Sequence, residues 1–132
     1  MTAKEWTKID NFTPKELTCK CGECAICNPS FSLLQKLDLA RIIIKEPIII
    51  LSGCRCESYN NTVTVGGSPT SSHIASASKE STAVDIKVSN SSYRYKLIKT
   101  LLNVGFTRLG IYKNFIHVDC DLSKPKKVIW CK

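Results

Sequence analysis

Near its end the chain reads Phe115-Ile116-His117-Val118-Asp119, a run with the alternation of a half-buried strand. Successive side chains of a strand point to opposite faces of a sheet. We therefore expect Ile116 and Val118 to enter the core, while His117 and Asp119 share the other face. The run predicts a sheet with one apolar face and one face that carries titratable groups.

A second alternating run lies at residues 83–88, where apolar side chains alternate with Asp85 and Lys87. The other histidine of the chain, His73, comes twelve positions before Asp85. If the two strands are neighbours, their polar faces converge, and Asp85 comes close to His117.

Two imidazoles and one carboxylate form a set that zinc takes in hydrolytic sites, where the fourth position stays open for water. We therefore predict that His73, Asp85 and His117 bind Zn²⁺ as a cofactor. The alternative is that both histidines are surface or hydrogen-bonded residues that hold no metal.

The remaining pattern predicts helices and further strands around these runs. Thr13 and Ser30 are expected N-caps, Pro14 occupies a first helical position, and Gly105 is expected to end a later helix. The expected helices begin at Pro14 and cover about 31–44 and 91–103, and the expected strands cover 48–51, 83–88, 108–112, 115–119 and 127–131. This order predicts an α+β fold, with a small antiparallel sheet and flanking helices.

Three details of this prediction concern burial and connection. The continuous apolar run 48–51 is expected to be a buried strand. Asn114 lies in a tight connection that favours a hairpin of the strands on either side of it. The apolar stripe of the helix 91–103 is expected to consist of Leu97, Ile98, Leu101 and Leu102.

At 132 residues the chain predicts a single domain, 1–132, that includes the cysteine-rich segment 19–28. No apolar run approaches the ~20 residues of a membrane span, and the first residues lack the pattern of a secretory signal. We therefore expect synthesis in the cytoplasm. The net charge of +8 suggests either a polyanionic neighbour or a solvated basic surface. No nucleic-acid motif accompanies it, so we expect no nucleic-acid partner, and we expect a monomer.

The eight cysteines leave two interpretations open. The first four could hold a second, structural zinc ion, because four thiolates form closed tetrahedral sites. Alternatively, the cysteines are buried thiols or form disulfides. The cysteines are Cys19, Cys21, Cys24 and Cys27, followed by Cys54, Cys56, Cys120 and Cys131.

A series of motifs in order gives the chain a resemblance to a known family. It resembles the zinc D-alanyl-D-alanine carboxypeptidases, in the branch related to VanY-type enzymes and phage endolysins with the hedgehog-like fold. The similarity extends over nearly the whole chain, from Phe12-Thr13-Pro14-Lys15-Glu16-Leu17 to Trp130. The motifs between them include Ser52-Gly53-Cys54-Arg55, Gly66-Gly67, Ser71-Ser72-His73, Ala83-Val84-Asp85, Gly110-Ile111-Tyr112 and Phe115-Ile116-His117-Val118-Asp119.

The resemblance implies a zinc peptidase that acts on the stem peptides of peptidoglycan, either as a D-Ala-D-Ala carboxypeptidase or in the manner of an endolysin. It implies zinc held by His73, Asp85 and His117. It also places Ser71 and Tyr112 near the substrate and gives Arg55 a substrate carboxylate or the developing oxyanion to bind. The missing signal sequence fits a lysin that reaches the cell wall through a phage-type pore, and it also fits a cytoplasmic dipeptidase.

The chain departs from the family pattern in two places. The family interval from histidine to aspartate is seven positions, whereas His73 and Asp85 are twelve apart. The extra residues could loop out and leave both ligands in place, since loop length costs little, or they could displace His73. Many relatives also carry an acid three residues before the last histidine, where this chain has Asn114.

An amide cannot accept a proton from water, so another group must act as general base. Asp119 is the first candidate, with Glu80 a distant second. Asp119 could instead orient His117 from behind. The departures also motivate two rival functions: a binding module that kept the fold and lost catalysis, and a cysteine-rich zinc module that acts through its basic surface.

Overall fold

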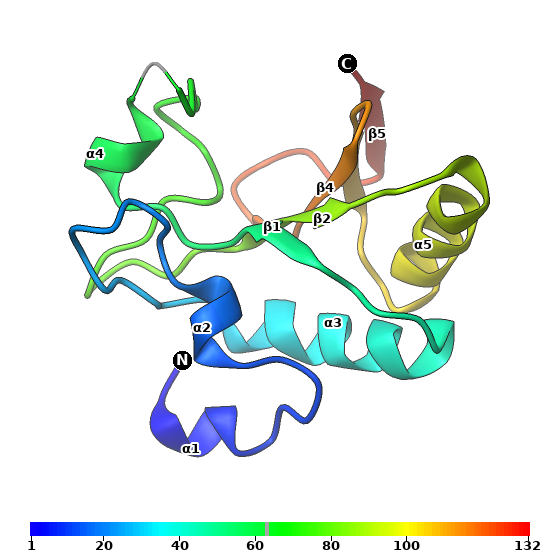
Figure 1. Ribbon diagram of the computed structural model, residues 1–132, viewed down its shortest axis with the longest axis horizontal. Coiled ribbons are helices and arrows are strands. Elements are labelled where there is room, and N and C mark those ends of the chain that lie inside the picture. The colour runs from blue at the N-terminus through cyan, green and yellow to red at the C-terminus, as the bar shows by residue number, and fades with distance from the viewer. Residues whose placement is uncertain (63) are drawn as a thin grey trace.

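The computed structural model describes residues 1–62 and 64–132, and within them five strands form one sheet (Figure 1). The strand order across the sheet is β1-β2-β4-β3-β5. The strands are β1 (Ile50–Ser52), β2 (Ala83–Lys87), β3 (Arg108–Ile111), β4 (Phe115–Asp119) and β5 (Val128–Cys131). The two runs that carry Asp85 and His117 are therefore neighbours, which is the condition for the expected convergence of their polar faces.

The pairing register brings the polar positions of the central strands side by side. Asp85 of β2 lies opposite His117 of β4, and Arg108 of β3 lies opposite Asp119. Three of the pairings in the described sheet are antiparallel, as expected, and β3 and β4 form the predicted hairpin. The pairing of β3 with β5 is parallel and differs from the expectation. Both edges of β4 are taken by β2 and β3, so β5 pairs with β3, which runs in the same direction.

The two long helices have the predicted bounds. They are α3 (Phe31–Ile44) and α5 (Ser91–Asn103). The Ser30 hydroxyl accepts a hydrogen bond from Leu33 N at 3.1 Å, and the Asn90 side chain accepts one from Tyr93 N at 2.8 Å, so each helix has a polar N-cap. Beyond α5 the chain turns at Gly105, whose φ of +102° is accessible mainly to glycine.

Three shorter helices complete the described elements, and one of them has the expected start. The helices are α1 (Ala3–Trp6), α2 (Pro14–Leu17) and α4 (Glu57–Asn60). Thr13 is the N-cap of α2, and the Glu16 carboxylate accepts a hydrogen bond from Thr13 N at 2.7 Å. In the described part of the chain, no helix is both long and apolar enough to cross a bilayer.

The hydrophobic core lies on one face of the sheet, where α3 and α5 pack (Figure 1). Val84, Ile86, Ile116 and Val118 turn toward this face and are fully buried, as their alternation predicts. They form one cluster with the apolar side of the helices, which includes Leu33, Leu34, Leu37, Leu97 and Leu101. Each such side chain contributes about 1.5–3 kcal/mol on burial. The core therefore stabilises the strands whose opposite face carries the polar groups.

Two burial predictions need correction. The run 48–51 is not a buried strand throughout, because Ile49 and Leu51 are 51% and 41% exposed. β1 is an edge strand, so only its inward side chains reach the core. Leu102 does not complete the apolar stripe of α5, since it is 43% exposed while Leu97 and Leu101 are fully buried.

Candidate active site

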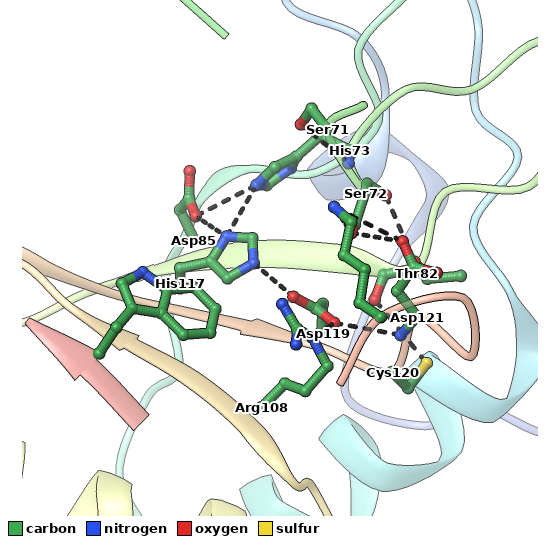
Figure 2. A network of polar contacts seen from close by, with 12 residues as sticks. Ser71, Ser72, His73, Thr82, Asp85, Arg108, His117, Asp119, Cys120 and Asp121 are labelled. Atoms are coloured by element: carbon green, nitrogen blue, oxygen red, sulfur yellow. Dashed lines mark hydrogen bonds and ion pairs between the residues drawn. The ribbon is translucent and has the colours of Figure 1, made fainter. Parts of the chain in front are cut away.

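The polar face of β2 and β4 carries a cluster of three side chains, shown in Figure 2. Asp85 and His117 are cross-strand neighbours, and His73 approaches them from the segment that precedes β2. Nε2 of His73 lies 3.2 Å from Oδ1 of Asp85, and Nδ1 of His117 lies 3.1 Å from the same oxygen. The two nitrogens are 3.3 Å apart. The three predicted ligands are thus brought together.

These spacings fit a tetrahedral zinc ion. With zinc–ligand bonds of about 2.0–2.1 Å, two ligand atoms of a tetrahedron lie about 3.3 Å apart. The three measured separations are 3.1–3.3 Å. Two imidazole nitrogens and one carboxylate oxygen are also the donors of catalytic zinc sites. The residues present therefore fit the metal predicted from the sequence.

The second nitrogen of each histidine determines which nitrogen is free to bind a cation. Nδ1 of His73 lies 2.7 Å from the carbonyl oxygen of Gly53, which can only accept, so Nδ1 carries the proton. Nε2 of His117 donates to Oδ2 of Asp119 at 2.8 Å. In the neutral rings this leaves lone pairs on Nε2 of His73 and Nδ1 of His117, the two atoms that face Asp85.

The electrostatics of the cluster favour a positive charge. Burial would raise the pKa of Asp85, but its contacts with His117 and His73, which become hydrogen bonds and ion pairs when the rings take up a proton, hold it well below its usual range. Burial would lower the pKa of His117, but hydrogen bonds with Asp119 and Asp85 raise it above its ordinary value. Asp85 stays anionic, and the site therefore attracts a proton or a metal ion.

Asp119 lies behind His117 in a buried position and is 1% exposed. Its Oδ2 accepts from His117, and its Oδ1 accepts from Arg108 Nε at 2.7 Å and from Asp121 N at 3.1 Å. Burial raises its pKa, but the hydrogen bonds from His117 and Asp121 N and the charge of Arg108 lower it below the usual range. Of the two roles considered for Asp119, these contacts match the residue that orients His117.

Arg55 lies on the other side of the cluster, and its side chain is largely enclosed by protein, at 14% exposed. Its Nη2 donates to Oδ2 of Asp85 at 3.1 Å, Nε to Ser52 Oγ at 3.0 Å, and Nη1 to Asn60 Oδ1 at 3.3 Å. Arginine carries five N–H groups, so this leaves donors for a ligand. Arg55 therefore holds the outer oxygen of Asp85 and also lines a cleft above the cluster.

A cleft of about 470 Å³ opens over the three-residue cluster. Ser71 and Tyr112, predicted near the substrate, both line it, as does Trp130. Tyr112 stacks on Phe115 with ring centroids 4.4 Å apart, and Trp130 Nε1 donates to the Tyr112 hydroxyl at 3.4 Å. The lining cations include Arg55, Arg108, Lys124 and Lys132. The cleft thus combines an aromatic wall with a basic lining above the candidate metal ligands.

The long interval between His73 and Asp85 loops out and leaves both ligands in place. Thr82 N donates to the Ser72 carbonyl at 2.9 Å, which closes the loop at its base. Its tip is held from outside, because Asn28 Nδ2 donates to the carbonyls of Ser76 at 2.9 Å and Lys79 at 3.2 Å. Of the two outcomes left open for the insertion, the structure has the one that keeps His73 beside Asp85.

The other candidate base does not reach the cluster. Glu80 forms an ion pair with the amino group of Met1 at 3.5 Å, and it is not among the residues that line the cleft. Asn114 lies in the β3–β4 turn, where its carbonyl accepts from Val88 N at 2.9 Å.

Sequence reasoning assigned no role in the site to Arg108, Lys124 or Asn60. Lys124 Nζ donates to the Thr70 carbonyl at 2.8 Å and to Ser72 Oγ at 2.9 Å, which ties the loop after β4 to the segment before His73. The pairing of Arg108 with Asp119 follows from the hairpin register and could have been read from it. Lys124 and Asn60 act across loops, and no periodic pattern signals such contacts.

Comparison with known proteins agrees with this geometry. The family model described as Peptidase M15 matches residues 10–119 of the chain. A search of curated proteins finds no match. The matched span contains the three candidate metal ligands together with Arg55, Ser71, Tyr112 and Asp119, whereas Trp130 lies beyond it.

Proposed function

The chain belongs to the peptidase M15 family, a family of zinc metallopeptidases, and from this membership we propose that it is a zinc peptidase of bacterial cell-wall peptides. Its substrate would be the stem peptide of peptidoglycan, cleaved beside a D-alanine. It would act either as a D-Ala-D-Ala carboxypeptidase or as an endolysin-like endopeptidase.

One observation carries the proposal: three donor atoms from distant parts of the chain converge at the spacing of zinc ligands. In both histidines the proton lies on the other ring nitrogen, so the converging nitrogens have free lone pairs. Gly53 and Asp119 accept the N–H groups of His73 and His117, so the free lone pairs point toward Asp85. A pair of histidines in hydrogen-bonded surface positions would have no reason to share this arrangement.

When bound, zinc would supply Lewis-acid chemistry, activating a water molecule and polarising the scissile carbonyl. The residues of the chain hold and aim the ligand atoms. Arg55 donates to the outer oxygen of Asp85, so that Asp85 presents its other oxygen to the site. The free N–H groups of Arg55 would bind a substrate carboxylate or the oxyanion.

The lining of the cleft supports an anionic peptide as substrate. A stem peptide that ends in D-alanine has a free carboxylate and only small methyl side chains at the cleavage point. Arg108, Lys124 and Lys132 add positive charge to the cleft, and Tyr112 and Trp130 form an apolar wall for the methyl groups.

The proton acceptor motivates a second candidate function. Among the described residues of the cleft, the carboxylates are Asp85 and Asp119, and both already have protein partners. A domain without a free base at this point would bind zinc and cell-wall peptide and not cleave it. The experiment must therefore measure binding and cleavage separately.

The test is release of D-alanine or peptides from purified peptidoglycan, followed by mass spectrometry to identify the broken bond. We expect release by the zinc-loaded protein, loss of release with a chelator, and loss in Asp85→Asn. Glu46→Gln is the matched control, because Glu46 is a surface acid paired with Lys96 at 3.2 Å. If the zinc-loaded protein sediments with peptidoglycan and releases nothing, the binding module is the correct reading. Release that survives both the chelator and Asp85→Asn would contradict the zinc mechanism.

A further inference from the structure

A second cluster of metal-binding side chains lies outside the cleft. The Sγ atoms of Cys19, Cys21, Cys24 and Cys56 all lie within 4.8 Å of one another. We propose that these four cysteines bind a second Zn²⁺ ion in a closed, structural site. This site shares no ligand with the histidine cluster, so it is separate from the proposed peptidase activity.

The geometry fits a tetrahedral thiolate site. With zinc–sulfur bonds of about 2.3 Å, two sulfurs of a tetrahedron lie about 3.8 Å apart. The upper limit of 4.8 Å on every pair, and the 3.4 Å between Cys21 and Cys24, bracket that value. All eight cysteines of the chain are free thiols, so the four sulfurs meet without any disulfide.

Backbone amides point at the sulfurs of this cluster. Cys21 Sγ accepts from Glu23 N at 3.4 Å and from Cys24 N at 3.3 Å. Cys19 Sγ accepts from Cys56 N at 3.3 Å, and Cys56 Sγ accepts from Tyr59 N at 3.4 Å. Four thiolates around Zn²⁺ leave two negative charges, and N–H donors of this kind stabilise them. A cluster of neutral thiols would gain much less from the same donors.

The local fold builds the site from two separate segments. Cys19 N donates to the Ile26 carbonyl at 2.9 Å, which closes the cysteine segment into a loop. Within it, Gly22 has a φ of +78°, so a glycine conformation turns the chain between Cys21 and Cys24. Cys56 comes from the segment between β1 and α4, where it is the N-cap of α4.

The fourth ligand differs from the one that the sequence favours. Spacing alone groups Cys27 with the first three cysteines, but Cys27 lies beyond the closure at Ile26. Its Sγ donates to the Pro14 carbonyl at 3.3 Å, away from the cluster. Tertiary structure thus replaces Cys27 by Cys56 as the fourth ligand.

With four protein ligands the ion has no open position, so its role is structural. It would connect the segment 19–26 to the residue that follows Arg55. The bound ion would therefore restrain the loop from which Arg55 reaches Asp85.

The test measures the zinc content of the full-length protein and of single variants of each site by inductively coupled plasma mass spectrometry. We expect two zinc ions per chain in the wild type and one in His117→Ala, which keeps the cysteine site. Cys56→Ser should lose one zinc ion, and Cys27→Ser, the matched control from the same cysteine-rich region, should keep both. In His117→Ala loaded with Co²⁺ alone, a thiolate-to-cobalt charge-transfer band should appear.

The cobalt spectrum keeps the test decisive if Cys56→Ser fails to fold, because His117→Ala has all four cysteines. Absence of the charge-transfer band would overturn the proposal. So would loss of zinc from Cys27→Ser with retention in Cys56→Ser, or a Cys21–Cys24 disulfide found in the purified protein. The cobalt band is measured in His117→Ala, which lacks one ligand of the histidine site, and the other two results concern cysteines alone, so none of them depends on the peptidase proposal.

Discussion

At the scale of single residues, the hydrogen-bond partner of each histidine determines which of its ring nitrogens is free to bind a metal ion. His117 can offer Nδ1 because its Nε2–H donates a hydrogen bond to Asp119, and Arg108 holds Asp119 in turn. The Arg108 guanidinium also lies over the Trp130 ring, 5.2 Å from its centroid. One buried ion pair thus connects the cluster of candidate metal ligands to the aromatic wall of the cleft.

Asp119→Asn is expected to weaken zinc binding at the histidine site by about 10- to 100-fold, the usual effect of removing a partner behind a metal ligand. The variant leaves the buried Arg108 without its counter-ion, so the free energy of unfolding should also fall by up to about 3 kcal/mol. Zinc titration and urea unfolding measure the two effects. If zinc affinity stays unchanged while turnover is lost, Asp119 is the general base and not the positioning residue.

Gly110 lies opposite His117 in the sheet, and a glycine is required there by close approach. A Cβ at this position would lie 2.6 Å from Cε2 and Nε1 of Trp130. The indole therefore covers the Gly110 backbone on the cleft side, and a larger residue would push Trp130 away from His117.

At the scale of elements, the segment between His73 and β2 shows how an insertion can be tolerated. The Thr82–Ser72 hydrogen bond closes the loop, and the Gly53 carbonyl holds the His73 ring independently of it. The loop tip is attached to Asn28 instead. The position of His73 and the position of the loop tip are therefore set by different contacts.

Asn28→Ala should lower the free energy of unfolding by about 0.5–1.5 kcal/mol, because the half-buried Ser76 carbonyl and the exposed Lys79 carbonyl lose their shared donor. Zinc content should stay at the wild-type value, since no contact of His73 changes. Urea unfolding and metal analysis check the two halves of this expectation. Loss of zinc from Asn28→Ala would mean that the loop tip, and not its base, positions His73.

At the scale of the whole molecule, the sheet separates stability from chemistry. One face packs on α3 and α5, and the other carries the histidine cluster and the cleft. Loops then close the cleft from its sides: Lys124 joins the loop after β4 to the segment 70–72, and Asp121 Oδ2 accepts from Ser72 Oγ at 2.7 Å.

This loop junction should make the protein sensitive to acid. Partial burial pushes the pKa of Asp121 upward, but hydrogen bonds from Ser123 and Ser72 and the charge of Lys124 lower it from 3.8 to about 2. A depressed pKa contributes stability that is fully present above the unfolded value and is lost as the pH falls through the folded value. Between pH 4 and pH 2 the free energy of unfolding should therefore fall by about 1 kcal/mol more in the wild type than in Asp121→Asn, after allowance for solvent screening.

Urea unfolding of both proteins across that pH range measures the difference. Asp10→Asn serves as the control, because Asp10 is an exposed acid. This variant should lose as much stability between pH 4 and pH 2 as the wild type does. If the wild type and Asp121→Asn lost equal amounts of stability at low pH, Asp121 would not be a cause of the acid sensitivity.

Much of the fold and of the candidate metal site could be predicted from local sequence. The alternation in 83–88 and 115–119 placed Asp85 and His117 on one face, and the bounds of α3 and α5 followed from their caps and apolar periodicity. The parallel β3–β5 pairing could not be read in this way. It depends on which strand edges are still free after β2, β3 and β4 have paired.

The sequence by itself determined the three candidate metal ligands, the two long helices and the two-faced strands, because each depends on residue chemistry or on a period of a few residues. Only the tertiary structure decided that Gly53 and Asp119 orient the histidines, that Arg55 holds Asp85, and that Cys56 joins the cysteine cluster in place of Cys27. These contacts join residues far apart in the chain. Their geometry exists only after the core has fixed the strand register and the loops have closed around it.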